Sequence, residues 1–138
     1  MKRFLYAACL AFLLSSTACA LNVSTVTVDV LAKTTSSWNG ETLPAYLQGQ
    51  PEVTILRIVI PPKMQLPLHQ HPIINAGVLL KGELTVITKD KKTLHLKAGD
   101  SIVEVVNTLH YGINEGSDPA EIIVFYAGIQ DKPITIKE

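Results

Sequence analysis

The chain has 138 residues, which is enough for one domain but too short for two independent hydrophobic cores. Its 12 basic residues balance its 12 acidic ones, and they form no long basic run. This composition argues against nucleic acid as a partner and against a polybasic contact with a membrane surface.

Residues 1–20 are expected to be a cleaved signal peptide. Lys2 and Arg3 form a basic start, and the apolar run 4–14 has the length of a signal-peptide core but is too short to span a bilayer. The small residues at 18–20 predict cleavage after Ala20. The domain is then 21–138, with no transmembrane segment, in a secreted or periplasmic protein.

Cys19 leaves an alternative open, because residues 16–19 loosely match a bacterial lipoprotein box. The product would then be anchored by a lipid at Cys19. Both cysteines, Cys9 and Cys19, fall in the leader, so the mature domain is expected to have no disulfide.

The pattern along 21–138 predicts short strands and no helix of three turns or more. Residues 21–30 alternate between polar and apolar and predict a half-buried strand. Residues 33–49 predict a loop, in which Trp38, Tyr46 and Leu47 cap one end of the core. The later strands are expected at 52–60, 66–71, 76–80, 83–88, 93–96, 101–106, 110–114, 120–127 and 133–137. The strands 76–80 and 83–88 are expected to form a hairpin. Strands at this spacing are typical of an all-β sandwich or barrel.

Three histidines are candidates for a metal site. His69 and His71 are two residues apart, so on a strand their side chains share a face. His110 ends a later turn. Three imidazoles can hold a divalent metal and leave a coordination position open.

The first of two motifs extends from Lys63 to Gly82. The sequence resembles the cupin family, whose first motif places Gly, five residues, His-x-His, three or four residues, Glu, six residues and Gly. His69, His71 and Gly82 match, while Lys63 stands at the first Gly and Asn75 at the Glu.

The second motif of the family places Gly, five residues, Pro, one, Gly, two, His, three and Asn. Gly99, His110 and Asn114 match it, while Val105 and Asn107 stand at the Pro and the inner Gly. The resemblance implies a single-domain cupin-type jelly-roll barrel, the double-stranded β-helix.

The resemblance also implies a ligand set. The metal ligands would be His69, His71 and His110, with Asn75 as a fourth ligand in place of an anionic Glu. An amide oxygen is a weaker ligand than a carboxylate. The cofactor would be a divalent transition metal, since three imidazoles suit Fe, Zn, Mn, Ni and Cu.

Two further residues are candidates for catalysis. Glu104 shares a strand face with Ile102 and Val106 and points inward if those two are core; otherwise it is solvated. An inward Glu104 could bind the metal or act as a general base. Tyr126 could offer its phenol to a ligand in the barrel or simply pack in the core.

Two classes of function stay open. The resemblance suggests a metal-dependent oxygenase or isomerase acting on a small organic molecule. The alternative is a non-catalytic cupin that binds a small ligand, such as a sugar or an organic acid, at a degenerate metal site. A structural role in the cell envelope is a third reading, and a homodimer through an edge strand is expected for an open β-fold.

Overall fold

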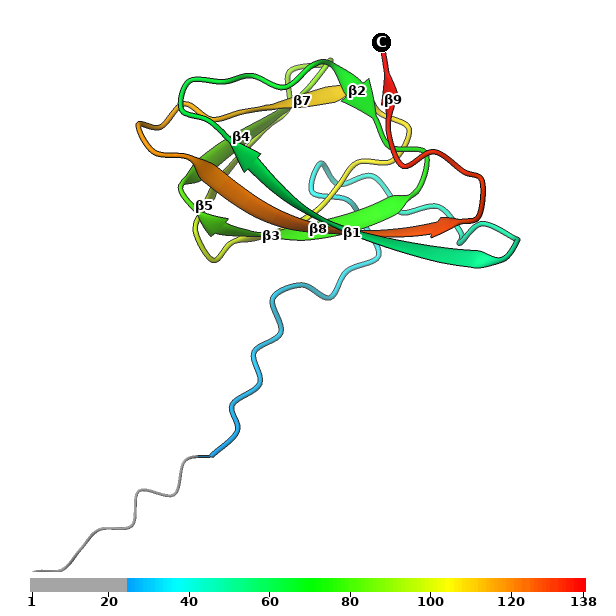
Figure 1. Ribbon diagram of the computed structural model, residues 1–138. Coiled ribbons are helices and arrows are strands. Elements are labelled where there is room, and N and C mark those ends of the chain that lie inside the picture. Colours follow the sequence, from blue (N-terminus) through cyan, green and yellow to red (C-terminus); the bar gives the residue numbers. More distant parts are fainter. Residues whose placement is uncertain (1–24) are drawn as a thin grey trace, which may run out of the picture.

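A computed structural model describes residues 25–138, which form two antiparallel β-sheets facing one another across a common interior (Figure 1). The expected leader, with its cleavage position and both cysteines, lies outside the described residues. Nine strands and no helix occur in the described part, which confirms the all-β prediction. Accordingly, residues 25–138 offer no helix long and apolar enough to cross a membrane.

The first sheet has four strands in the order β1, β8, β3 and β6. Their bounds are β1 Pro51–Ile60, β8 Ala120–Ile129, β3 Ile74–Lys81 and β6 Ser101–Val103. β1 shows why the sheet has an inner and an outer face, because its side chains alternate. Leu56, Ile58 and Ile60 point inward, whereas Ile55 and Val59 are exposed outside.

The second sheet has five strands in the order β5, β4, β7, β2 and β9. Their bounds are β5 Thr93–Lys97, β4 Glu83–Thr88, β7 His110–Ile113, β2 His69–Gln70 and β9 Ile136–Lys137. Apolar side chains from both sheets meet in the core, among them Ile60, Leu79, Leu84, Val86, Ile102, Ile122 and Val124. The two sheets leave a cavity between them at the end where β2 and β7 lie.

The half-buried strand predicted at 21–30 is wrong for the part that the structure describes. Residues 25–30 are irregular and exposed, with Val26 93% accessible. The edge strand β6 is short and pairs with β3 on one side only. Its Val103 carbonyl already accepts a hydrogen bond from the Trp38 amide. Little of that edge is therefore left for a further strand.

The hairpin predicted from 76–80 and 83–88 is also wrong. β3 and β4 follow one another around Gly82 but belong to different sheets. β3 is already paired on both sides, with β8 and with β6, so it has no free edge for β4. Gly82 has φ 72°, and a Cβ there would lie 2.7 Å from the Pro119 carbonyl, so the crossing between sheets requires glycine.

The predicted cap of the core is correct for one of its three residues. Trp38 packs against the core. Tyr46 is 74% exposed and Leu47 is also exposed. Both lie outside the barrel, next to Pro51 and Ile129 at the ends of β1 and β8, because the loop passes over the outer surface here.

Candidate metal centre

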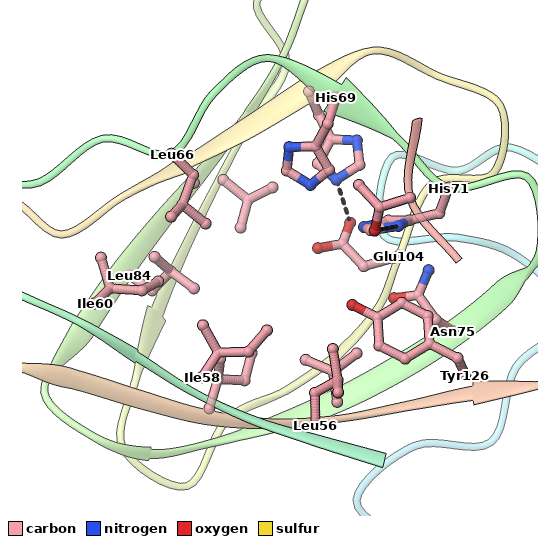
Figure 2. Close-up of a pocket in the computed structure, with 16 residues that line it drawn as sticks. Leu56, Ile58, Ile60, Leu66, His69, His71, Asn75, Leu84, Glu104 and Tyr126 are labelled. Carbon is pink, nitrogen blue, oxygen red and sulfur yellow. Dashed lines mark hydrogen bonds and ion pairs between the residues drawn. The ribbon is translucent and has the colours of Figure 1, made fainter. Parts of the chain in front are cut away.

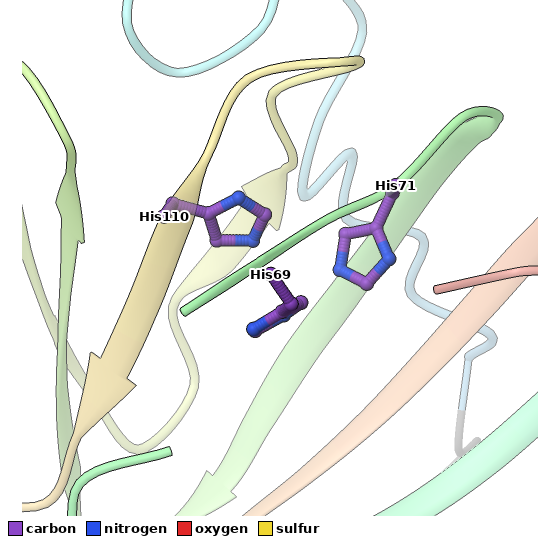
Figure 3. Close-up of side chains that lie close together, drawn as sticks. All are labelled: His69, His71 and His110. Carbon is purple, nitrogen blue, oxygen red and sulfur yellow. The ribbon is translucent and has the colours of Figure 1, made fainter. Parts of the chain in front are cut away.

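Neighbouring strands bring the three histidines together. His69 on β2 lies directly opposite His110 on β7, and His71 follows β2 immediately. Figure 3 shows the three rings grouped around one point. One ring nitrogen from each histidine lies within 4.8 Å of the others. The period-2 spacing of His69 and His71 and the pairing of β2 with β7 together create this arrangement.

Each imidazole is oriented by a backbone carbonyl on its Nδ1 side. Nδ1 lies 2.7 Å from the Pro67 oxygen in His69, 2.8 Å from the Ile134 oxygen in His71 and 2.9 Å from the Thr108 oxygen in His110. A carbonyl can only accept, so each Nδ1 carries the proton and each Nε2 keeps a free lone pair. This is the usual support of metal-binding histidines.

The histidines are held in the neutral form that binds metals. Burial lowers the pKa of His71 to about 4, and it also lowers the pKa of His69 and of His110. The Nε2 of His110 is buried and has no hydrogen-bond partner in the described structure. A buried, unpaired and neutral ring nitrogen is costly unless something binds it, so these residues fit a metal ion.

The nitrogens face the cavity between the sheets, which has a volume of about 170 Å³ (Figure 2). Its wall near the histidines is polar, and its far wall is built of aliphatic side chains. The polar wall comprises His69, His71, Asn75, Glu104, His110, Tyr126 and Thr135. The aliphatic wall comprises Leu56, Ile58, Ile60, Leu66, Leu84, Val86, Ile122 and Val124.

Glu104 points into the cavity. Figure 2 shows its carboxylate directed toward the histidines, and its Oε2 lies 3.7 Å from the Nε2 of His110. Regular pairing of β6 ends at Val103, so strict alternation stops there: Val105 is buried, and only 13% of the Glu104 side chain is exposed. The question left open by the sequence is thus resolved in favour of an inward Glu104.

The pKa of the Glu104 carboxyl is raised, mainly by burial. Burial raises this pKa to about 7, against opposing contributions from the Val105 amide, the Trp38 indole and His69. A carboxyl that titrates near neutral pH can both accept and donate a proton. The position suits either a proton-transfer group or an additional anionic ligand.

Asn75 lies on β3 with its amide in the cavity wall, beside Glu104 and Tyr126 (Figure 2). The side chain is 1% exposed, and neither Oδ1 nor Nδ2 has a hydrogen-bond partner in the described structure. Such an amide is unusual in a core, and both of its polar atoms are available to a ligand in the cavity. The backbone carbonyl of Asn75 accepts a hydrogen bond from the backbone amide of Glu104 at 3.0 Å, which places the two residues next to one another.

Tyr126 lies opposite Asn75 on the paired strand β8. Its ring contacts His71 edge-on, with centroids 5.4 Å apart, and its phenol faces the cavity. Burial, and then the charge of Glu104, raise the pKa of the phenol to about 12. Tyr126 therefore stays protonated and can donate a hydrogen bond to a ligand.

Sequence reasoning missed Thr135 and the three carbonyls that orient the histidines. Thr135 lines the cavity, and its hydroxyl lies 3.2 Å from His71 Nδ1. It comes from the C-terminal segment that pairs with β2. No motif marks Thr135, because its role depends on a pairing between segments more than 60 residues apart in the chain.

Other motif positions are structural. The buried Asn114 amide donates to the Ile60, Pro61 and Asp118 carbonyls and so holds a loop in place. Lys63 and Asn107 stand where the motifs have glycine, and their φ values are 62° and 55°. The backbone has thus kept the left-handed conformation although the glycines are gone.

Facing antiparallel sheets with three convergent histidines inside define a small jelly-roll protein with the donor set of a metal centre. The sequence model described as Cupin domain matches residues 56–126, just over half of the chain. The chain belongs to the cupin family. No protein of curated function matches the sequence.

Solved structures agree with this fold. An oxalate oxidase in complex with the substrate analogue glycolate is 26% identical, with a TM-score of 0.54 over 62% of this chain and 45% of that one. The DMSP lyase DddQ from Ruegeria pomeroyi DSS-3 is 19% identical, with a TM-score of 0.54 over 62% and 42%. The Bacillus subtilis oxalate decarboxylase, described with Mn(II) centres, is 21% identical, with a TM-score of 0.53 over 62% and 23%. The match spans less than half the length of each of these chains.

Proposed function

We propose that this protein is a metal-dependent cupin that acts on a small organic molecule, with His69, His71 and His110 as the metal ligands. The observation that carries this proposal is the arrangement of the ring nitrogens. All three Nδ1 atoms are hydrogen-bonded to backbone carbonyls, which leaves the lone pairs of the three Nε2 atoms available beside one cavity. Histidines that served only the core would use both nitrogens in hydrogen bonds.

The charge that Asn75 does not supply is available from Glu104. The Asn75 amide is neutral, but Glu104 is hydrogen-bonded to Asn75 through the backbone, and its carboxyl lines the same cavity. A carboxylate beside a divalent cation is stabilised in its charged form. We therefore infer that Glu104 provides the negative charge of the centre and that Asn75 binds through its amide oxygen.

A divalent transition metal bound here, whether Fe, Zn, Mn, Ni or Cu, would supply oxygen chemistry or Lewis-acid activation according to its identity. The protein contributes the surroundings. Glu104 holds or accepts a proton at its carboxyl, and Tyr126 donates a hydrogen bond from its phenol. The aliphatic wall keeps bulk water away from the reacting groups. These roles fit an oxygenase or an isomerase.

The second candidate function is a non-catalytic binding protein for a small ligand. It is favoured by one observation, the neutral Asn75 at the position where the motif has Glu. The histidines and Asn75 would then hydrogen-bond a sugar or an organic acid directly. This reading needs no metal, so the two candidates differ in a measurable property.

We further propose that the mature product is the domain 21–138, released into a secreted or periplasmic location after cleavage behind Ala20. The form anchored at Cys19 is the alternative. Mass spectrometry of the protein expressed from the full sequence would distinguish the two by the mass of the first residue.

The experiment that tests the main proposal is elemental analysis of purified 21–138, beside the variant His69→Ala/His110→Ala. We expect close to one equivalent of a transition metal in the natural protein and little in the variant. His95→Ala is the matched control, since His95 is exposed and lies outside the cavity. A folded protein that takes up no metal when it is supplied would leave only the binding function.

A further inference from the structure

The cavity has a polar wall at the histidines and an aliphatic wall facing them, with the open volume between the two. We infer that its ligand is a small amphiphilic molecule of about six carbons in all, with one neutral or singly charged head group at the histidines and an uncharged hydrocarbon body. This inference rests on the proposed function for the position of the head group. The hydrocarbon part rests on the cavity wall alone.

The lining of the far end and the size of the whole cavity support a small hydrocarbon body. Leu66, Leu84, Val86, Ile122 and Val124 come from both sheets and offer no hydrogen-bonding side chain. The whole cavity, polar end included, has a volume of about 170 Å³, close to that of an engineered cavity of about 150 Å³ that binds benzene, so a ligand of about six carbons in all fills it. Polar atoms placed in the far end would lose their hydration without compensation.

The charge of the lining limits the head group. No Lys or Arg lines the cavity within residues 25–138, and Glu104 is its only carboxylate. Lys137 lies near enough to act on His69 electrostatically, but it is exposed on β9 and is not part of the wall. A divalent metal with neutral histidines and an ionised Glu104 would carry a net charge of one, which a single anionic head group neutralises. A second anionic group would have no cation to pair with.

Three polar groups remain for the head group once the histidines hold a metal. The Asn75 amide keeps its Nδ2 donors when its oxygen binds the metal, the Tyr126 phenol donates, and the Thr135 hydroxyl lines the same wall. They surround one end of the cavity only. The head group is therefore fixed at this end and the body extends toward β4 and β8.

The test uses straight-chain monocarboxylates from acetate to octanoate as probes, with binding to Zn²⁺-loaded 21–138 measured by calorimetry. Each buried CH₂ should improve the affinity about twofold to fourfold until the cavity is full near hexanoate. Adipate, which has the same six-carbon chain with a second carboxylate, should bind at least about a hundredfold more weakly than hexanoate.

Two variants localise the effect. Val86→Thr keeps the volume of the side chain but places a hydroxyl in the aliphatic wall, and it should reduce the gain per CH₂ without changing metal uptake. Val53→Thr makes the same change on an exposed strand position outside the barrel and should change neither property. Metal uptake by Val86→Thr also shows that this variant is folded.

The outcomes are distinct. An affinity that rises with chain length and excludes adipate supports the inference. A metal-loaded protein that shows no gain with length, or that binds adipate as well as hexanoate, overturns it and leaves the metal centre intact. If no metal binds, the proposed function fails. The same carboxylate series is then measured on the metal-free protein. An affinity that rises with chain length supports the hydrocarbon-binding end of the cavity, and an affinity that does not rise overturns it.

Discussion

Glu104 and Asn75 together determine the charge of the cavity. The carboxyl that the cupin motif places on β3 is an amide here, and a carboxyl after β6 points into the same space. We expect Glu104→Gln to weaken Zn²⁺ binding about tenfold to a hundredfold, because it removes the only carboxylate that lines the cavity within residues 25–138. Competition with a chromophoric chelator measures this.

The double variant Asn75→Glu/Glu104→Gln is the sharper comparison. It returns a carboxylate to the cavity from β3, so it should recover most of the lost affinity. If the double variant binds Zn²⁺ as weakly as Glu104→Gln alone, the charge of the carboxylate is not what Glu104 contributes.

Opposing titrations should act on the stability of the metal-free protein between about pH 4.5 and 6.5, with three histidines on one side and Glu104 on the other. His71 has a folded pKa of about 4, below its ordinary 6.5, and burial also lowers the pKa of His69 and His110, so the stability tied to their neutral forms is lost as the pH falls from 6.5. Glu104 has a folded pKa of about 7, above its ordinary 4.5, so burying it costs stability as the pH rises from 4.5.

Glu104→Gln should remove one of these two effects. At pH 7.5 the metal-free variant should be more stable than the natural protein by up to about 3 kcal/mol, because no carboxylate has to ionise in the cavity. Its stability should then fall more steeply than that of the natural protein as the pH drops from 6.5 to 4.5, because Glu104 no longer opposes the three histidines. Urea unfolding across this range tests the prediction, and a variant with the same slope as the natural protein contradicts it.

Among the elements, the turn between β4 and β5 contains a strained residue. Lys91 has φ 70° in an exposed turn, a conformation that costs a side-chain-bearing residue about 1 kcal/mol. Lys91→Gly should therefore raise the free energy of unfolding by roughly that amount. Lys92→Gly removes the same charge at a position without positive φ, so it should be neutral or destabilising. Equal effects of the two substitutions would contradict the backbone explanation.

The C-terminal segment supports the metal centre although it is only a short edge strand. The Ile134 carbonyl and the Thr135 hydroxyl both contact His71, and β9 pairs with β2. Deleting 133–138 should lower Zn²⁺ affinity about tenfold or more, because His71 loses its orientation. Deleting Glu138 alone removes an exposed ion pair with Lys89 and should have little effect on the affinity. Equal affinity of both truncated proteins would exclude this role.

At the scale of the whole molecule, the sequence predicted what depends on local spacing. The alternation in β1, the turns at Gly82 and Gly99 and the common face of His69 and His71 follow from neighbouring residues. The predictions were wrong where the outcome depends on which strands pair with one another. Whether β4 pairs with β3, and whether 25–30 finds an edge, depends on which edges other strands have already taken.

For the candidate site too, some residues could be predicted from the sequence and others depend on how the chain folds. The resemblance to the cupin motifs identified the three histidines, and the side chain of Glu104 became clear only once β6 was seen to end at Val103. Thr135 could not be found, because its contact with His71 spans most of the barrel sequence. The homodimer expected from open edge strands stays a prediction, which light scattering coupled to gel filtration would test.

The central claim is that three Nε2 atoms share one metal. The most direct measurement is a long-range ¹H–¹⁵N NMR spectrum of the imidazoles in 21–138, before and after one equivalent of Zn²⁺. We predict the Nδ1–H form for His69, His71 and His110, with Zn²⁺ shifting the Nε2 signal of all three and leaving the exposed His95 unchanged. Unshifted Nε2 signals in the three cavity histidines, or a shift confined to His95, would contradict the account.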